Sequence, residues 1–379
     1  MWAMPFDPFA IAENTALIPA EPDLLFTFGP TDTLKKNSLL TALMQRYPNA
    51  IQLGCSTGTA VSADGLCDNG FSGLALGFDH TRLTVVSESL DDPGQSYSVG
   101  QMLGQKLAAT DLAGIYLITD GLAVNGSAIV HGLQDVLGRD AVISGGMAGD
   151  GARFGETLVS LNGKVTAGTI VAIGFYGDAI RFAHGCVGGW DAFGPRRRIT
   201  AAQCSTLFEL DGRPALDLYE SYLGPEAEEL PASGLLYPLL IWDPAEPDEH
   251  FVRTLLAIDR EAKSLTFAGD VPEGWQAQLM RGSVDRLIDG ASRAASDAKN
   301  AMAAQECAPT VCLFVSCVGR RLLLGQQTEE EIEAVREVLG HDLVMAGYYS
   351  YGEIAPHAGS HFAGLHNQTV TLTLLAEQP

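Results

Sequence analysis

The sequence contains no long apolar run and no recognisable secretion signal. No stretch approaches the ~18–20 consecutive apolar residues that a membrane-spanning helix needs. Residues 1–20 lack a basic start, and acids and prolines interrupt their apolar stretch, unlike a signal peptide. The seven cysteines are an odd number, which fits reduced thiols better than a framework of disulfides. We therefore expect a cytoplasmic protein without a membrane span.

Positive charge is also scarce. The chain has 23 Lys and Arg against 46 Asp and Glu, a formal net charge of -23. This balance repels nucleic-acid phosphates and anionic membrane surfaces, so we expect neither as a partner. With 46% apolar and 18% charged residues, the 379-residue chain has ample material for a folded core in two or three domains.

Several nucleotide- and haem-binding motifs are missing. Gly121 and Gly126 have the spacing of a Walker loop, but the lysine that would contact the phosphates is absent. No Gly-x-Gly-x-x-Gly follows a strand and opens a helix. No Cys-x-x-Cys-His is present either, which excludes covalent c-type haem.

Three segments repeat one order of elements: a strand ending at glycine, a helix, a second Gly-rich strand, a turn and a further strand. The first strands are residues 24–28, 114–120 and 311–319, and the helices are about 32–46, 127–137 and 328–339. In the third helix, Thr328 and Glu331 have the spacing of a capping box. The pattern predicts an α/β fold of duplicated strand–helix–strand–turn–strand units with mixed sheets flanked by helices.

A region of different character separates the second and third segments. It contains a Gly-rich loop at 184–195, a short helix at 216–223 and a hairpin within 251–268, and a long Ala-rich helix follows at 283–304. Glycine, proline and acidic residues cluster at 224–235, which predicts a domain boundary there.

Residues Gly54-Cys-Ser-Thr-Gly58 match the nucleophile elbow of hydrolases, in which a strand precedes the serine and a helix follows it. In this chain the following residues have no helical periodicity. The segment is therefore a small-residue turn, a turn whose backbone N–H groups face a ligand, or a Ser or Cys nucleophile. Cys55 and Cys317 each stand near the glycine end of a strand and could border one pocket.

The densest aromatic stretch is Tyr348-Tyr-Ser-Tyr-Gly-Glu353. Alternate tyrosines on an extended strand face one side, together with Glu353. Such a face suits a pocket wall with a polar group, and core packing explains it equally well.

A strand-end histidine and an arginine run complete the candidates. His184 ends an apolar strand and opens a Gly-rich loop, so it could bind iron or another ligand, or serve as a hydrogen-bonded structural residue. Residues 196–198 are three consecutive arginines, which could pair with ligand carboxylates or face solvent.

Five segments together resemble the FIST family of sensory proteins. They are Gly54-Cys-Ser-Thr-Gly58, Gly145-Gly-Met-Ala-Gly-Asp-Gly151, Ser316-Cys-Val-Gly-Arg320, Gly347-Tyr-Tyr-Ser-Tyr-Gly-Glu-Ile-Ala-Pro356 and His366-Asn-Gln-Thr369. The resemblance implies an N-terminal extension at 1–21, a FIST N-like domain at 22–224 and a FIST C-like domain at 225–379. It also implies a non-enzymatic ligand sensor in bacterial signalling that contacts a histidine kinase or a cyclic-di-GMP enzyme. A homodimer remains open.

One branch of the family, the haem-binding nitric-oxide sensors, is similar in three further segments: 188–195, 208–216 and 267–274. This resemblance implies haem b, with His184 as iron ligand and Arg196 and Arg197 as propionate partners. The alternative is a sensor of small metabolites such as amino acids, and a Ser or Cys hydrolase is the third hypothesis. The predicted ligand-binding residues are Cys55, Ser56, Thr57, Gly146, Cys317, Tyr349, Tyr351 and Glu353.

Overall fold

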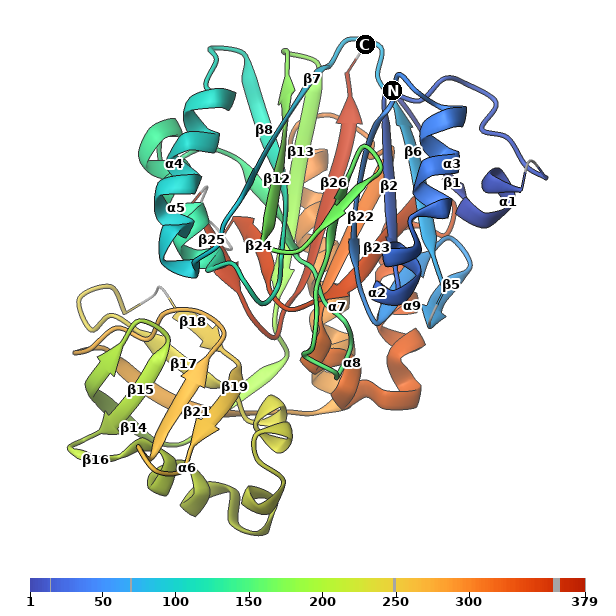
Figure 1. The fold of residues 1–379 in the computed structure, drawn as a ribbon. Coiled ribbons are helices and arrows are strands. Elements are labelled where there is room, and N and C mark those ends of the chain that lie inside the picture. Colours follow the sequence, from blue (N-terminus) through green and yellow to red (C-terminus); the bar gives the residue numbers. More distant parts are fainter. Residues whose placement is uncertain (14, 69, 248–249, 357–361, 379) are drawn as a thin grey trace.

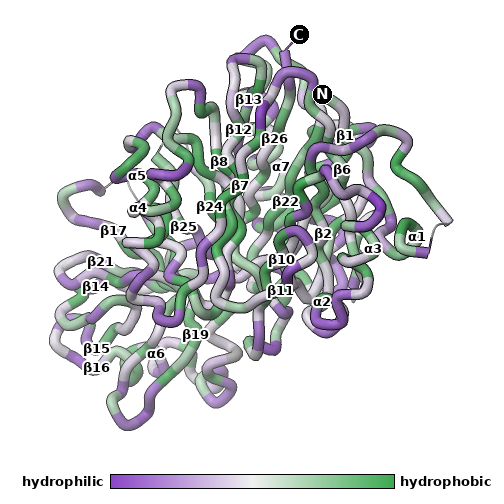
Figure 2. The backbone as a smooth tube through the Cα atoms, turned by 45° about the horizontal axis from the view of Figure 1, so that its top comes forward, coloured by the Kyte–Doolittle hydropathy of each residue, from purple (hydrophilic) through white to green (hydrophobic). Residues whose placement is uncertain are grey.

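The computed structural model describes the chain except residues 14, 69, 248–249, 357–361 and 379. A large α/β core and a smaller β-rich part lie against each other (Figure 1). Hydrophobic stretches concentrate in the central strands of the core, and hydrophilic stretches lie in the outer loops (Figure 2). Among the described residues, no helix is both long enough and apolar enough to cross a membrane.

The core contains three copies of one sheet arrangement, which confirms the predicted repeat. In each copy the first strand lies in the middle, parallel to the second strand and antiparallel to the last. Unit one uses β2 (Leu24–Gly29), β3 (Ile51–Ser56) and β6 (Ser72–Gly77); unit two uses β8 (Leu112–Thr119), β9 (Ile143–Met147) and β12 (Thr169–Tyr176); unit three uses β22 (Val311–Cys317), β23 (Val344–Ser350) and β26 (Val370–Glu377).

A further strand pairs with the last strand of each unit. These strands are β1 (Trp2–Phe6) on β6, β7 (Arg82–Ser89) on β12 and β13 (Ile180–Val187) on β26, all antiparallel. Each copy therefore has the same four-strand order, and the two later copies begin directly after the preceding unit ends. This regularity supports an origin by duplication.

The hairpin after each second strand joins the sheet of another unit. Hairpin β4–β5 (Thr59–Ser62, Gly65–Asp68) of unit one pairs with β23 of unit three. Hairpin β10–β11 (Val159–Leu161, Lys164–Thr166) of unit two pairs with β3 of unit one. Hairpin β24–β25 (Glu353–Pro356, Ala363–His366) of unit three pairs with β9 of unit two. The three six-stranded sheets are thus linked in a closed ring of exchanged hairpins.

The inner faces of the three sheets pack on one shared core. Phe26 of unit one meets Tyr116 of unit two edge to face at 5.4 Å, and Phe28 meets Tyr348 of unit three at 4.8 Å between ring centroids. All four rings are buried. Burial of such large apolar surfaces is the main stabilising contribution at this centre.

Helices cover the outer faces of the sheets. The predicted helix at 32–46 is two helices, because Asn37 adopts a left-handed backbone (φ 55°) between them. The bounds are α1 (Pro8–Ala12), α2 (Thr31–Lys36), α3 (Ser38–Arg46), α4 (Ser96–Leu107), α5 (Gly126–Leu137), α7 (Val284–Ala303), α8 (Val318–Leu324) and α9 (Thr328–Leu339), with short 3-10 helices at Pro93–Gln95 and Gly325–Gln327.

The capping box predicted for α9 is wrong. Gln327 is the N-cap residue, and the Thr328 hydroxyl donates to the Gly325 carbonyl oxygen at 2.7 Å. The Glu331 side chain points into the protein instead of back to the helix start, because it pairs there with a buried arginine.

The β-rich part, which we call the inserted domain (residues 190–282), leaves the core after β13 and returns at α7. It has its own apolar core, which includes Ile199, Leu207 and Phe267. Its elements are β14 (Trp190–Gln203), β15 (Thr206–Leu210), β16 (Arg213–Pro214), α6 (Ala215–Leu223), 3-10 helices Gly224–Glu229 and Ala232–Leu236, β17 (Leu239–Trp242), β18 (His250–Arg253), β19 (Leu255–Asp259), β20 (Ser264–Phe267) and β21 (Gln276–Gly282). The predicted division between residues 224 and 225 falls within this domain.

Candidate functional site

The ends of the three second strands meet at one junction. The Gly149 amide donates to the Ser56 carbonyl oxygen at 2.9 Å, and the Thr57 hydroxyl donates to the Tyr349 carbonyl oxygen at 2.8 Å. A Cβ atom on Gly58 would lie 2.5 Å from the Gly151 Cα atom, so only glycine permits this approach. The structure therefore brings Ser56, Thr57 and the tyrosine stretch together.

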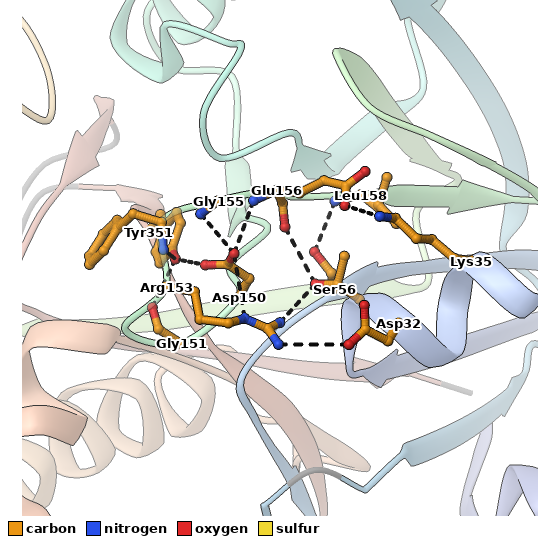
Figure 3. A network of polar contacts seen from close by, with 12 residues as sticks. Asp32, Lys35, Ser56, Asp150, Gly151, Arg153, Gly155, Glu156, Leu158 and Tyr351 are labelled. Carbon is orange, nitrogen blue, oxygen red and sulfur yellow. Dashed lines mark hydrogen bonds and ion pairs between the residues drawn. The ribbon is translucent and has the colours of Figure 1, made fainter.

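Asp150 is the centre of the polar network at this junction (Figure 3). Its carboxylate accepts the Gly155 amide at 2.9 Å, the Glu156 amide at 3.0 Å and the Tyr351 hydroxyl. The Ser56 hydroxyl oxygen accepts the Leu158 amide at 2.9 Å. Asp150 was not among the predicted site residues, although it lies in the Gly-rich segment that carried the family resemblance.

Tyr349, Tyr351 and Glu353 have separate surroundings, so the predicted common face does not form. The Tyr349 hydroxyl donates to Glu331 at 2.6 Å, whereas Tyr351 faces Asp150. Glu353 accepts the Ser350 hydroxyl and the Thr369 hydroxyl, the latter at 3.0 Å. The strand ends at Ser350 and restarts at Glu353, which breaks the alternation.

Arg320 and Glu331 form a fully buried ion pair, and Arg320 also contacts the backbone on both sides of the inserted domain. Arg320 Nε lies 2.6 Å from Glu331 Oε1, and both side chains are 0% exposed. The same guanidinium donates to the carbonyl oxygens of Gly188 and Leu287 at 2.9 and 2.8 Å. Arg320 therefore holds the chain where it leaves for the inserted domain and where it returns.

The remaining predicted ligand residues lie inside the core. Burial raises the pKa of the Cys55 and Cys317 thiols, which keeps both protonated. A Cβ atom on Gly146 would meet Val315 and the Tyr348 hydroxyl below 3 Å, so this glycine is needed for packing. Strand β4 follows Ser56 where a nucleophile elbow would have a helix.

The residues proposed to hold haem lie in two different sheets. His184 is on β13, where its Nδ1 lies 3.4 Å from the Thr373 hydroxyl and burial lowers its pKa to about 4. Arg197 pairs with Asp211 and Tyr222 in the inserted domain, and Arg196 lies over the Trp242 ring. The structure does not bring these groups together, and within its described part no three His, Cys, Asp or Glu side chains form a metal-binding group.

The described residues also enclose a cavity that the sequence did not indicate. It has a volume of about 270 Å³ and lies between the core and the inserted domain, lined by Ser127, His131, Arg139, Asp243, Glu246, Phe251, Arg253, Asp270, Pro272, Trp275, Phe362, Gly364 and Leu365. We call it the charged cavity. Its walls come from α5, β25, β18 and the loops after β17 and β20.

Arg253 is the most deeply buried charged group of this cavity. The side chain is 5% exposed, its Nε donates to the Asp270 carbonyl oxygen at 2.8 Å and its Nη1 to Val252 at 3.2 Å. Burial lowers its pKa to about 10, which leaves it charged at neutral pH. Among the described residues no carboxylate forms an ion pair with it. Ser127 lines the same cavity, and its buried hydroxyl has no hydrogen-bond partner among the described residues.

Other contacts fasten the inserted domain to the core. The Trp190 indole donates to the Gln368 carbonyl oxygen at 2.9 Å, and the Gln368 amide donates to the Leu235 carbonyl oxygen at 3.0 Å. Asn125, the N-cap of α5, donates to Asp270 at 3.2 Å. Gln368 belongs to the His366–Thr369 segment of the family resemblance, which therefore docks the inserted domain.

The fold and this cavity define an α/β protein in which a threefold core and an inserted β domain enclose a ligand-sized space. The chain belongs to the FIST family: the FIST N domain matches residues 23–213 and the FIST C domain matches residues 215–356. FIST domains are associated with small-ligand sensing in signal transduction. The division between the two matches falls inside the inserted domain, so these segments are not two separate structural units.

Two further similarities were found. An uncharacterized protein of Methanocaldococcus jannaschii, MJ1623, is 25% identical over 373 residues, covering 87% of this chain and 69% of that protein. The crystal structure of cyanuric acid hydrolase from A. caulinodans is 11% identical, covers 100% of this chain and 99% of that chain, and has a TM-score of 0.35. That similarity is too low to support an inference about activity.

Proposed function

We propose that this FIST protein senses a small metabolite with a carboxylate group, and that the metabolite binds in the charged cavity. The observation that carries the proposal is Arg253. Among the described residues no carboxylate lies within ion-pair distance of this buried guanidinium, and the charge of Asp270 offsets only part of the cost of burial, so a ligand carboxylate would supply a closer charge and a bidentate acceptor. The neighbouring Ser127 hydroxyl offers a further hydrogen bond.

The rest of the wall favours an amino-acid-like ligand. Three carboxylates, Asp243, Glu246 and Asp270, line the same cavity as two arginines, so a zwitterion meets groups of both signs. Phe251 and Trp275 supply flat apolar surface, with ring centroids 5.8 Å apart. A cavity with apolar walls and a few converging polar groups is typical of small-molecule sites.

Signalling would follow from the position of the cavity. A ligand that contacts both the core and the inserted domain favours the arrangement in which both sets of contacts form, and so shifts the population of states. A partner histidine kinase or cyclic-di-GMP enzyme inside the cell would read that shift. We propose no catalytic step for the bound metabolite.

A thermal-shift screen with the standard amino acids tests the proposal. An amino acid present at about 100 times its Kd stabilises the native state by about 2.7 kcal/mol and raises the Tm. Arg253→Met should abolish this increase, whereas Arg260→Met, which alters an exposed arginine paired with Glu220, should preserve it. If no amino acid raises the Tm, or if both variants respond like the wild type, the proposal is wrong.

Haem-based detection of nitric oxide stays a second prediction. The supporting observation is that His184 Nε2 is buried and has no hydrogen-bond partner among the described residues. Two observations argue against this version. His184 is not among the residues that line the charged cavity, and Arg196 and Arg197, the expected propionate partners, lie in a different sheet from His184. A Soret band that appears on haem reconstitution and changes in His184→Ala would support haem, and its absence would end this version.

A further inference from the structure

A second cavity lies directly beside the charged one and has a different character. It has a volume of about 380 Å³, and apolar side chains dominate its walls: Leu122, Val124, Met147, Leu256, Phe267 and Leu365. We call it the apolar cavity. Tyr351 of the central junction also lines it. Nothing in the proposed recognition of a zwitterion uses this space.

The two cavities share their walls. Leu365 lines both, while Gly126 of the apolar cavity is followed in the chain by Ser127 of the charged one. In the same way Gly269 lines the apolar cavity and Asp270 the charged cavity. The Asn125–Asp270 hydrogen bond of 3.2 Å crosses between the core and the inserted domain at this point. The cavities are therefore neighbouring parts of one cleft.

Two exposed leucines belong to the apolar cavity, one from each side of the cleft. Leu122 of the core is 42% exposed, and Leu256 of the inserted domain is 39% exposed. When an apolar group covers large side chains that border a cavity and are exposed to solvent, the burial of their surface lowers the free energy.

We propose that both cavities form one site for an amphipathic ligand. Its charged head would meet Arg253, and an unbranched hydrocarbon chain would pass Leu365 into the apolar cavity. This inference rests on the proposed function, because it extends the same site from a compact amino acid to one with a long apolar side chain. The competing occupant of the apolar cavity, an apolar segment of a partner protein, predicts no dependence on ligand chain length.

Straight-chain α-amino acids test the inference because they vary the tail and keep the head. Alanine, 2-aminohexanoic acid and 2-aminooctanoic acid would be titrated calorimetrically into the full-length protein. Each additional buried methylene should lower the Kd about fourfold. Leu256→Asp and Leu122→Asp place a carboxylate beside the tail and should remove most of this gain while preserving alanine binding.

Leu322→Asp is the matched control, because Leu322 on α8 is 40% exposed and lines neither cavity. It should retain the full chain-length dependence. Equal affinity for the three amino acids, or loss of the dependence in Leu322→Asp, would overturn the amphipathic ligand. If chain length has no effect but Arg253→Met still abolishes binding, only this inference fails. If none of the three amino acids binds to the wild type while a standard amino acid still raises the Tm, again only this inference fails; if no amino acid binds at all, it fails together with the proposed carboxylate site.

Discussion

Burial decides the protonation of Glu353, a single carboxyl group sealed inside the core. Its side chain is 0% exposed and contacts Ser350 and Thr369. Desolvation raises its pKa from 4.5 to about 8, although the hydrogen bonds work in the opposite direction. Glu353 is therefore mostly protonated at neutral pH.

This pKa predicts a specific pH dependence of stability. Between pH 4.5 and 8 the folded state keeps a proton that the unfolded chain has released, so the contribution is complete below pH 4.5 and is lost as the pH rises. Each pH unit in this window should reduce the free energy of unfolding by about 1.4 kcal/mol. Glu353→Gln should remove this part of the slope, as measured by urea denaturation at pH 5, 6.5 and 8.

Subtracting the pH dependence of the Glu353→Gln variant from that of the wild type separates the contribution of Glu353 from those of other buried groups. Burial lowers the pKa of His184 and His366 to about 4, and both therefore contribute a slope of the opposite sign between pH 4 and 6.5. Glu329→Gln, which changes a carboxyl in the first turn of α9, is the control. Parallel curves for the wild type and Glu353→Gln would contradict the assigned pKa.

Some site residues could be predicted from the sequence, and others could not. Ser56, Thr57 and Tyr351 could be found because each stands within two residues of a glycine at a strand end. Arg253 could not, because an arginine in the segment His250–Arg253 has the pattern of an ordinary half-exposed strand. Its burial depends on residues distant in the chain, such as Gly269 and Asp270, which lie against its side chain.

At the scale of elements, the start of α5 is one of the places where the core contacts the inserted domain. The Asn125 side chain accepts the Ala128 amide at 3.1 Å as a helix cap and donates to Asp270. The helix thus begins at the wall between the two cavities. Asn125 therefore stabilises the start of α5 and also connects the two sides of the cleft.

Asn125→Ala should therefore have two effects. Loss of the cap should reduce stability by about 1 kcal/mol, and loss of the contact with Asp270 should weaken binding of the amino acid that gives the largest thermal shift. Ser283→Ala is the control, because Ser283 caps α7 through the Arg286 amide and does not line either cavity. Urea denaturation and calorimetric titration of both variants separate the two effects; equal binding losses would contradict the role of Asn125 in the cleft.

Local sequence signals predicted most helices, since their periodicity and caps lie within a few residues. They failed where a distant contact decided the outcome. Glu331 has the spacing of a capping box, but Arg320 provides a buried ion pair that outweighs a cap at the surface. The break at Asn37 has no comparable cue beyond the tolerance of asparagine for a left-handed backbone.

At the scale of the whole molecule, the exchanged hairpins make the three units depend on one another. A fragment of residues 1–187 would contain units one and two but lack β23, the partner of β4, and β24, the partner of β9. We expect this fragment to show no cooperative thermal transition by circular dichroism.

Residues 190–282 form the contrasting fragment, because the strands of the inserted domain pair with one another and enclose their own core. This fragment should melt cooperatively. A sharp transition in the 1–187 fragment would show that the ring of hairpins is not needed for folding.

The sequence predicted three units but not the ring, since strand order within a unit is local whereas the partner of a hairpin is not. Nothing in the segment Thr59–Asp68 indicates that it pairs with β23 rather than with β3.

The ring has a consequence for the rate of folding. The first hairpin to leave the ribosome pairs with a strand near the other end of the chain, so it must wait until nearly all of the protein has been synthesised. Such a high contact order predicts slow folding. During this interval β4 and β9 lack their partner strands β23 and β24, and their unpaired edges favour aggregation, so the nascent chain should depend on chaperones more than its compact native state suggests.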